Sequence, residues 1–284
     1  MQASETLANH QRVQLTVGAS IRTWMYYAPH SAADESLPLV LMLHGAGGSS
    51  IFSATETGWS KLAEHEKFVV VYPDGLPPDK EKPAKFLTNP QEWNDGSGRA
   101  LNHQDEEFII KLISSMLDRY PINARRIYLT GFSNGAGMAF RLAAHHPELF
   151  AAIAPVAGHC WLENSPFVRQ IPTYYLIGGA DPLMPVAGGV TRTPWGKIEN
   201  RPSVLNSLNR WRTILQLPHL TSLENTHQDG FQIQIIPNLG HHWPGGAGQM
   251  GEKLGGPHHK EIDATQLIWD FFQKHSLKSR RTDQ

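Results

Sequence analysis

The sequence predicts an α/β fold in which a mostly parallel sheet is covered by helices on both faces. Continuous apolar runs such as Leu39–Leu43 are typical of strands that are buried on both sides. They alternate with amphipathic stretches such as Asp105–Tyr120, as expected for parallel strands joined by crossover helices. Residues 11–28 differ, because apolar and polar residues alternate on both sides of a turn, which predicts an antiparallel hairpin at the N-terminal end.

The strands are predicted from runs of β-branched and other apolar residues that end in loop-forming residues. In the opening hairpin, Val13, Leu15 and Val17 share one face, and the turn lies at 18–20. The strands expected after Leu39–Leu43 are Phe68–Tyr72, Ile127–Thr130, Ala151–Val156, Thr173–Ile177 and Phe231–Ile236. Residues 74–103, rich in Pro, Gly, Asn and Lys, are expected to form a long loop, which in a compact domain is usually functional.

The helices are predicted from apolar residues spaced three and four positions apart. Asp105–Tyr120 has such a stripe, and Asp105 and Glu106 in its first turn are expected to complement the positive end of the helix dipole. The other expected helices are one rich in small residues that ends near Pro147, one capped by Ser203, and Asp263–Lys274.

The composition is that of a globular domain. With 284 residues, of which 40% are hydrophobic and 18% charged, we expect one catalytic domain at 11–275 between an N-terminal tail (1–10) and a polar C-terminal tail (276–284). The net charge of −1 does not indicate nucleic acid binding, and the apolar runs are too short to span a membrane. The single Cys160 excludes an internal disulfide, and the oligomeric state stays open.

The most informative stretch is Gly131-Phe132-Ser133-Asn134-Gly135, which follows a predicted strand and precedes a predicted helix. A G-x-S-x-G pattern in this context places the serine on a tight turn with its hydroxyl exposed. The two glycines keep side chains out of the crowded turn. The sequence therefore predicts that Ser133 is a nucleophile.

A serine hydroxyl needs a base, normally a histidine that a carboxylate orients. Asp181 follows the predicted strand Thr173–Ile177, and the pair His241-His242 follows the predicted strand Phe231–Ile236. Serine, aspartate and histidine in this order, each after a strand, indicate a Ser-His-Asp triad. A simple Asp-Pro turn is the alternative for Asp181, and spacing alone does not choose between the two histidines.

Acyl transfer also needs two backbone N–H donors that bind the oxyanion. One is expected at Asn134, directly after the nucleophile. The other is expected in the Gly-rich loop His44–Gly48, where Ala46 is the first choice and Gly47 the second. A Gly-rich turn that only ends a strand is the alternative.

Seven motifs across about residues 12–274 resemble those of the feruloyl esterase and polyhydroxybutyrate depolymerase-like family of α/β-hydrolase serine esterases. They are Leu43-His44-Gly45-Ala46-Gly47-Gly48, Trp93-Asn94-Asp95-Gly96, Asp105-Glu106-Glu107-Phe108-Ile109, Gly131-Phe132-Ser133-Asn134-Gly135-Ala136-Gly137-Met138, Ala180-Asp181-Pro182, Gly240-His241-His242-Trp243-Pro244-Gly245-Gly246 and Ile268-Trp269-Asp270-Phe271-Phe272. The resemblance implies the α/β-hydrolase fold and a serine esterase that needs no metal or other cofactor. It also implies that His241, directly after Gly240, is the catalytic histidine.

Export and substrate are less defined. The family resemblance favours a periplasmic or extracellular protein, whereas the first residues have neither the basic nor the apolar region of a signal peptide. Cys160 stands alone where many extracellular relatives carry a cysteine pair. A Gly/His-rich insert, Ala247–His259, follows the Trp-Pro-Gly-Gly motif. Both departures leave the substrate open.

Three tryptophans in predicted loops are candidate substrate contacts. Trp93, Trp195 and Trp243 lie near the carboxyl ends of strands, where they would form an aromatic platform for an aryl acyl group. Trp161 is a weaker candidate. Burial in the core is the alternative for each of them.

The sequence favours a carboxylic ester hydrolase that acts on a small or oligomeric ester. Feruloyl or other aryl esters, short-chain acyl esters, and hydroxyalkanoate polyesters or oligomers are its open substrate classes. A ligand-binding protein on a hydrolase scaffold is an alternative. A metallohydrolase is another, because His241-His242 and His258-His259 offer ligands, but no H-E-x-x-H or similar spacing is present and no metal is predicted.

Overall fold

A computed structural model describes residues 7–278, apart from 31–35, 99–103, 164 and 229. Its centre is a twisted sheet with the strand order β1-β2-β4-β3-β5-β6-β7-β11-β10. Their bounds are β1 (Gln11–Val17), β2 (Ser20–Tyr27), β3 (Leu37–Leu43), β4 (Val69–Pro73), β5 (Ile122–Phe132), β6 (Ala152–Val156), β7 (Thr173–Gly178), β10 (Thr226–Gln228) and β11 (Phe231–Ile236). The six strands from β4 to β11 along this order pair in parallel, and β1, β2 and β10 add antiparallel edges.

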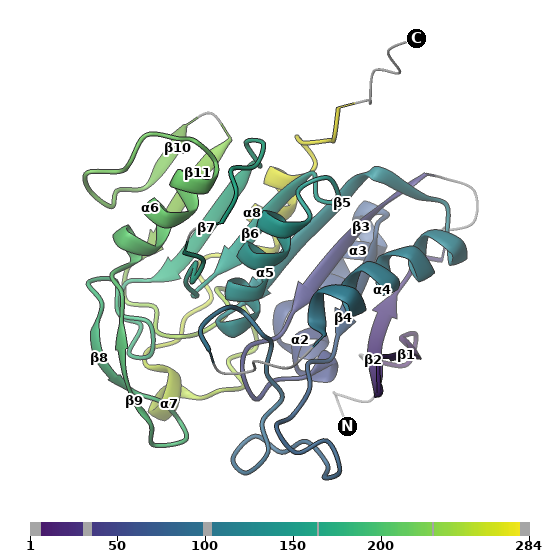
Figure 1. The fold of residues 1–284 in the computed structure, drawn as a ribbon, viewed down its shortest axis with the longest axis horizontal. Coiled ribbons are helices and arrows are strands. Elements are labelled where there is room, and N and C mark those ends of the chain that lie inside the picture. The colour runs from purple at the N-terminus through teal and green to yellow at the C-terminus, as the bar shows by residue number, and fades with distance from the viewer. Residues whose placement is uncertain (1–6, 31–35, 99–103, 164, 229, 279–284) are drawn as a thin grey trace.

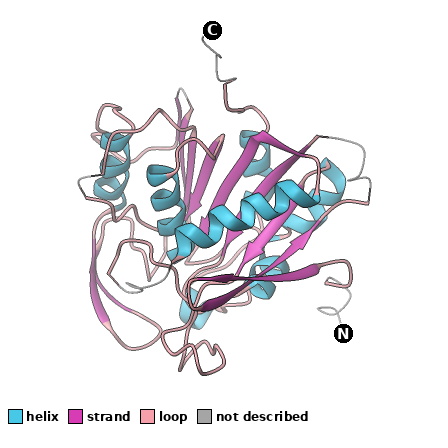
Figure 2. Cartoon of the chain, turned by 45° about the vertical axis from the view of Figure 1, so that its right-hand side comes forward, coloured by secondary structure: helices cyan, strands magenta, loops and turns pink. Residues whose placement is uncertain are grey.

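The hydrophobic pattern explains this sheet. β3, β4, β6 and β7 are buried along their whole length, because helices cover both faces. Figures 1 and 2 show helices on both sides of the sheet, with α4, α5 and α6 on the side nearer the viewer in Figure 1. The helices are α2 (Ser50–Thr57), α3 (Trp59–Glu66), α4 (Asp105–Arg119), α5 (Asn134–His145), α6 (Val204–Ile214), α7 (Glu252–Gly255) and α8 (Ala264–Phe272).

The predicted fold is confirmed, and its elements are found within a few residues of their expected bounds. The predicted cap at Ser203 is present, and Asp263 caps a second helix. Ser203 accepts a hydrogen bond from Asn206 N, and Asp263 accepts one from Gln266 N. Within the described residues, no helix has both the length and the apolar content that crossing a membrane requires.

Several elements of the structure were not predicted from the sequence. They are α2 and α3 after the Gly-rich loop, the hairpin of β8 (Gly189–Arg192) and β9 (Ile198–Arg201), the edge strand β10, and the short α7. The hairpin is mostly exposed, so its residues carry little of the apolar alternation that identifies a strand. Because the parallel strands end at one edge, the loops after β3, β5, β7 and β11 meet there.

Candidate active site

Ser133 lies at the tight turn between β5 and α5, with a φ of 55° and a ψ of −115°. A positive φ is uncommon for a residue with a side chain, and such strain is concentrated at functional sites. The Ser133 N–H donates to Val156 O at 2.8 Å, which ties the turn to β6. The backbone of the turn is therefore fixed in a conformation that presents the serine side chain to the carboxyl edge of the sheet.

The glycines of the motif are required by close backbone contacts. A Cβ atom at Gly131 would lie 2.3 Å from Gly135 O, and one at Gly135 would lie 2.5 Å from His44 O. No side chain fits at either position, because the contacted atoms belong to the backbone. This agrees with the role that the sequence predicts for both glycines.

His241 and Asp181 are brought together from the loops after β11 and β7. Nδ1 of His241 lies 2.7 Å from Oδ2 of Asp181, and both side chains are buried. A carboxylate only accepts hydrogen bonds, so Nδ1 carries the proton and Nε2 keeps its lone pair. Oδ1 of Asp181 accepts from Leu183 N and Met184 N at 2.8 and 2.7 Å. Asp181 thus forms the turn of the alternative interpretation and orients His241 as well.

The neighbouring His242 has a different place. Its Nε2 lies 3.0 Å from Gly256 O, so this ring faces the insert after the Trp-Pro-Gly-Gly motif. The insert also pairs with the histidine loop through its backbone, because His241 N donates to Gly255 O at 2.5 Å and Gly240 N donates to Pro257 O at 2.7 Å. The structure therefore brings His241, and not His242, to the carboxylate.

Both residues predicted as oxyanion donors, Asn134 and Ala46, line the same cavity as Ser133. Asn134 begins α5, where a backbone N–H has no acceptor within the helix. In the Gly-rich loop, Gly47 N donates to Gln91 O at 2.7 Å, which leaves Ala46 as the better donor of the two candidates. Gly45 packs closely on this turn, since a Cβ there would lie 3.2 Å from the Ser133 side chain.

Trp93 joins the Gly-rich loop to the start of α5 through buried hydrogen bonds. Its Nε1–H donates to His44 O at 2.9 Å. Its backbone N–H donates to Asn134 Oδ1 at 2.7 Å, and Asn134 Nδ2 donates back to Trp93 O at 3.1 Å. The His44 ring is fixed as well, because Nε2 accepts from Gly75 N at 2.8 Å and Nδ1 then donates to Gly45 O at 2.7 Å. One buried residue therefore connects the Gly-rich loop with the start of α5.

A buried ion pair supports the segment that carries Trp93. Arg22 Nη2 lies 2.7 Å from Asp105 Oδ1, and both side chains are 1% exposed. The other oxygen of Asp105 accepts from Asn94 N at 2.7 Å. The expectation that Asp105 mainly complements the helix dipole was therefore incomplete, because its carboxylate is a buried partner of Arg22. The two residues are 83 positions apart, and no sequence pattern indicates that they pair.

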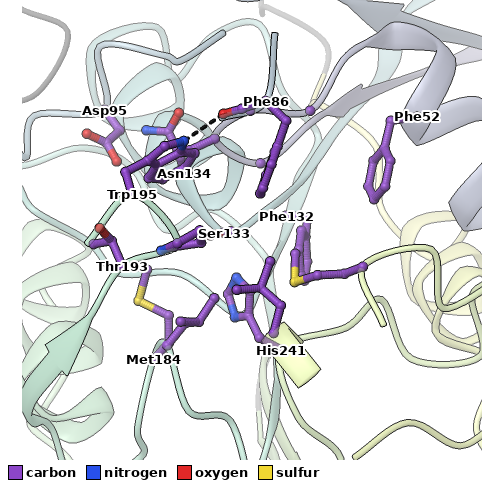
Figure 3. A pocket seen from close by; sticks show the side chains of 18 of the residues that line it. Phe52, Phe86, Asp95, Phe132, Ser133, Asn134, Met184, Thr193, Trp195 and His241 are labelled. Carbon is purple, nitrogen blue, oxygen red and sulfur yellow. Dashed lines mark hydrogen bonds between the residues drawn. The ribbon is translucent and has the colours of Figure 1, made fainter. Parts of the chain in front are cut away.

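A cavity of about 460 Å³ lies over Ser133 and His241. Figure 3 shows both residues facing it, with Phe52, Phe86 and Phe132 on one side and Asp95 and Thr193 on the other. The side with the three phenylalanines is thus apolar and the other is mixed, because Met184 and Trp195 lie there too. The volume is in the range of small-molecule sites.

The four candidate tryptophans divide into two pairs. Trp195 and Trp161 line the cavity. Trp195 lies near Phe86, with ring centroids 5.6 Å apart, and donates from Nε1 to Phe86 O at 2.6 Å (Figure 3).

The structure places Trp93 and Trp243 away from the expected platform. Trp93 is fully buried, and Trp243, 2% exposed, donates from Nε1 to Thr265 Oγ1 at 2.9 Å. Neither lines the cavity over Ser133. The prediction of an aromatic platform is corrected for these two residues, because their indole N–H groups bind interior acceptors.

The Gly/His-rich insert forms part of the cavity wall. Gln249, Met250 and Leu254 face the cavity. The buried carboxylate of Glu56 holds the insert, because Oε1 accepts from Gly248 N at 2.9 Å and Oε2 accepts from Gln249 N at 3.0 Å. The insert therefore connects α2 with the histidine loop.

The histidine pairs do meet in part, since the rings of His242 and His258 lie 4.9 Å apart. Across the described ranges, no three His, Cys, Asp or Glu side chains converge as metal ligands.

Solved structures define the class of this fold. The acetyl xylan esterase from Aspergillus awamori aligns with a TM-score of 0.59 over 86% of this chain and 98% of its own, at 16% identity. A thermostable esterase aligns with a TM-score of 0.58 over 96% of this chain and 64% of its own, also at 16% identity. The chain therefore has the α/β-hydrolase fold of such esterases.

The family follows from the sequence match. Residues 22–181, more than half of the chain, match the family described as "Esterase PHB depolymerase", and the chain belongs to this family. The matched part contains the Gly-rich loop, Ser133 and Asp181, and it ends before the histidine loop.

Curated relatives match over shorter stretches. The bifunctional acetylxylan esterase/xylanase of Neocallimastix patriciarum is 31% identical over 158 residues, which are 56% of this chain and 21% of the relative. Poly(3-hydroxyalkanoate) depolymerase C of Paucimonas lemoignei is 33% identical over 128 residues, 45% of this chain and 29% of the relative. Feruloyl esterase B of Thermothelomyces thermophilus is 28% identical over 134 residues, 47% and 43% of the two chains. The matched stretch spans less than half of each of these relatives.

Proposed function

We propose that this protein is a carboxylic ester hydrolase that works through an acyl-enzyme on Ser133. The observation that carries the proposal is the buried 2.7 Å contact of His241 Nδ1 with Asp181, in a loop that faces the same cavity as Ser133. This contact leaves Nε2 of His241 as the base for a serine hydroxyl. The names of the relatives, which are esterases and a polyester depolymerase, support the same chemistry.

The proposed reaction has two stages. The Ser133 hydroxyl attacks the ester carbonyl while His241 takes its proton, and Asp181 stabilises the imidazolium that forms. The N–H groups of Asn134 and Ala46 bind the oxyanion, and His241 then protonates the leaving alcohol. In the second stage His241 activates a water molecule, which attacks the acyl-enzyme and frees Ser133.

Two substrate classes are each supported by a different observation. The apolar side of the cavity, with Trp195 at its rim, favours an aryl or short-chain acyl group. The similarity to a poly(3-hydroxyalkanoate) depolymerase favours a hydroxyalkanoate oligomer as the second candidate. Parallel rates on methyl ferulate, p-nitrophenyl acetate and hydroxybutyrate oligomers would separate the two classes.

The test of the proposal is the Ser133→Ala variant. We expect turnover of p-nitrophenyl acetate to fall by about 10³-fold or more, because the nucleophile is removed while the binding cavity is kept. Near wild-type turnover in a folded Ser133→Ala protein would reject the proposal, and loss of that remaining activity on chelation would point to a metallohydrolase.

A further inference from the structure

A second cavity opens beside the one over Ser133. Its volume is about 830 Å³, and it shares Ser97, Trp161 and Arg201 with the first cavity. The two cavities therefore adjoin at these three residues. A substrate whose ester group lies at Ser133 would extend into the second cavity if it were long enough.

Three arginines belong to the lining of the second cavity. Arg141, Arg201 and Arg210 line it together with His145, and Glu163 is the only carboxylate among its described lining residues. Arg210 Nη2 lies 3.2 Å from Glu163 Oε1, and the Glu163 side chain is 69% exposed. Such an exposed pair is weak, so it leaves Arg210 open to exchange its partner for a ligand.

The carboxylates that balance the other two arginines lie outside the lining. Glu106 binds Arg141 Nε at 2.7 Å, and Glu199 binds Arg201 Nη2 at 2.7 Å. Neither acid is among the described residues that line the second cavity. The described lining therefore combines three arginines with a single carboxylate, Glu163.

Arg141 is fixed before any ligand arrives. Its Nη1 donates to Asn94 Oδ1 at 2.8 Å in addition to the bond with Glu106. Burial acts to raise the pKa of Glu106, but hydrogen bonds from His145 and Arg141 outweigh it and lower that pKa to about 2. Glu106 stays ionised at neutral pH, so it holds the guanidinium in one orientation and reduces the ordering cost of binding.

We propose that the second cavity binds a carboxylate carried by the ester substrate. A carboxylate only accepts hydrogen bonds, and it therefore matches a lining of arginine donors better than a hydroxyl does. The proposal rests on the esterase function proposed above and narrows its substrate class to esters with an acid group beyond the scissile bond. The free end of a hydroxyacid oligomer and a uronic acid both offer this group.

The test compares each acid with its own methyl ester as a substrate. One pair is the 3-hydroxybutyrate trimer, with the acid on the alcohol side, and a second is acetylated glucuronic acid. A third is mono-p-nitrophenyl adipate, with the acid on the acyl side. We expect kcat/KM to be about tenfold higher for the acid in at least one pair, and the preference to shrink as salt is added.

Two variants assign the preference to the cavity. Arg210→Gln is expected to remove most of the preference, and Arg210→Lys to keep part of it, because lysine retains the charge without the planar fork. Arg119→Gln is the matched control, since Arg119 is an exposed arginine at the far end of α4 and should leave the preference unchanged.

The outcomes are distinct for the two proposals. The carboxylate site would be overturned if the enzyme hydrolysed the methyl esters as fast as the acids in every pair. It would also be overturned if the preference for the acid persisted in Arg210→Gln. Either result would leave the esterase proposal intact. Absence of Ser133-dependent hydrolysis for every ester would instead overturn the esterase proposal.

Discussion

The floor and the rim of the cavity are built in different ways. The floor consists of the Ser133 turn, the start of α5 and the Gly-rich loop, and buried hydrogen bonds through Trp93 tie it together. The rim comes from exposed segments: Phe86 in the long loop, Trp195 in the β8–β9 hairpin and Met250 in the Gly/His-rich insert. The floor lies within the matched family region 22–181, whereas much of the rim lies after it.

We infer from this difference that the floor sets the rate of the reaction and the rim sets the choice of substrate. A floor held by buried bonds keeps the reacting groups in one geometry, which acyl transfer requires. A rim on surface loops can change without disturbing the core, so it is the natural place for substrate choice. Changes in the floor should therefore lower turnover of every ester, and changes in the rim should alter the ranking of esters.

The largest effect is expected from Asp181→Asn. An amide at this position can no longer both accept from Nδ1–H and stabilise the imidazolium, so kcat should fall by about 10³-fold or more for every ester. Steady-state kinetics with an aryl and an acetyl ester would measure this. A loss below tenfold would mean that Asp181 is only a turn residue.

A smaller and equally general loss is expected from Trp93→Phe. This change removes the N–H bond to His44 O and keeps an aromatic ring, so kcat should fall by about thirtyfold with KM nearly unchanged. The matched control is Trp211→Phe, because Trp211 is also buried but donates to Thr173 Oγ1 at the other edge of the sheet. Equal losses of kcat in both variants would show that Trp93 acts only through stability.

Trp195→Ala should act on the rim alone. We expect kcat/KM for aryl acyl esters to fall by about fivefold, the size of a lost aromatic contact, with p-nitrophenyl acetate almost unaffected. An equal loss for both esters would contradict the separation of floor and rim.

The smallest expected effect is on the pH dependence of the unfolding free energy, through His159. His159 is fully buried, neither ring nitrogen has a partner within the described part of the chain, and burial followed by the charge of Arg201 lowers its pKa to about 3. The unfolded chain, with a pKa near 6.5, takes up a proton below that pH while the folded chain stays neutral. Stability is therefore lost as the pH falls below about 6.5.

Replacing His159 should remove this pH dependence. Between pH 7 and 5.5 the wild type should lose about 1 kcal/mol of unfolding free energy through this residue, and His159→Phe should lose correspondingly less. Urea unfolding at the two pH values measures the difference. Parallel losses in both proteins would contradict a neutral His159.

Much of the floor, and the positions of Asp181 and His241 in the chain, could be predicted because the signals are local. A glycine-flanked serine between a strand and a helix specifies its own turn, and the aspartate and histidine follow strands that end at one edge. Only the choice of His241 over His242 needed more than spacing. In the structure it depends on which ring faces Asp181, and the backbone pairing of the insert with Gly240 and His241 helps to fix that orientation.

The parts that were missed depend on contacts between distant residues. Trp93 and Trp195 both appeared as loop tryptophans, and only the fold shows that one is buried behind the floor and the other lines the cavity. The ion pair of Arg22 with Asp105 and the hydrogen bond of Glu56 with Gly248 in the insert likewise join segments far apart in the chain. Hydrophobic patterns carry no information about such pairs, because buried polar partners are chosen by three-dimensional proximity.

The most direct test of the central claim is to find which residue becomes covalently modified. The folded protein should be treated with a fluorophosphonate and its peptides mapped by mass spectrometry, with Ser133→Ala and Asp181→Asn as controls. We predict one adduct on Ser133, slower labelling in Asp181→Asn and none in Ser133→Ala. A folded, active protein that is not labelled, or that is labelled at another residue, would contradict the account.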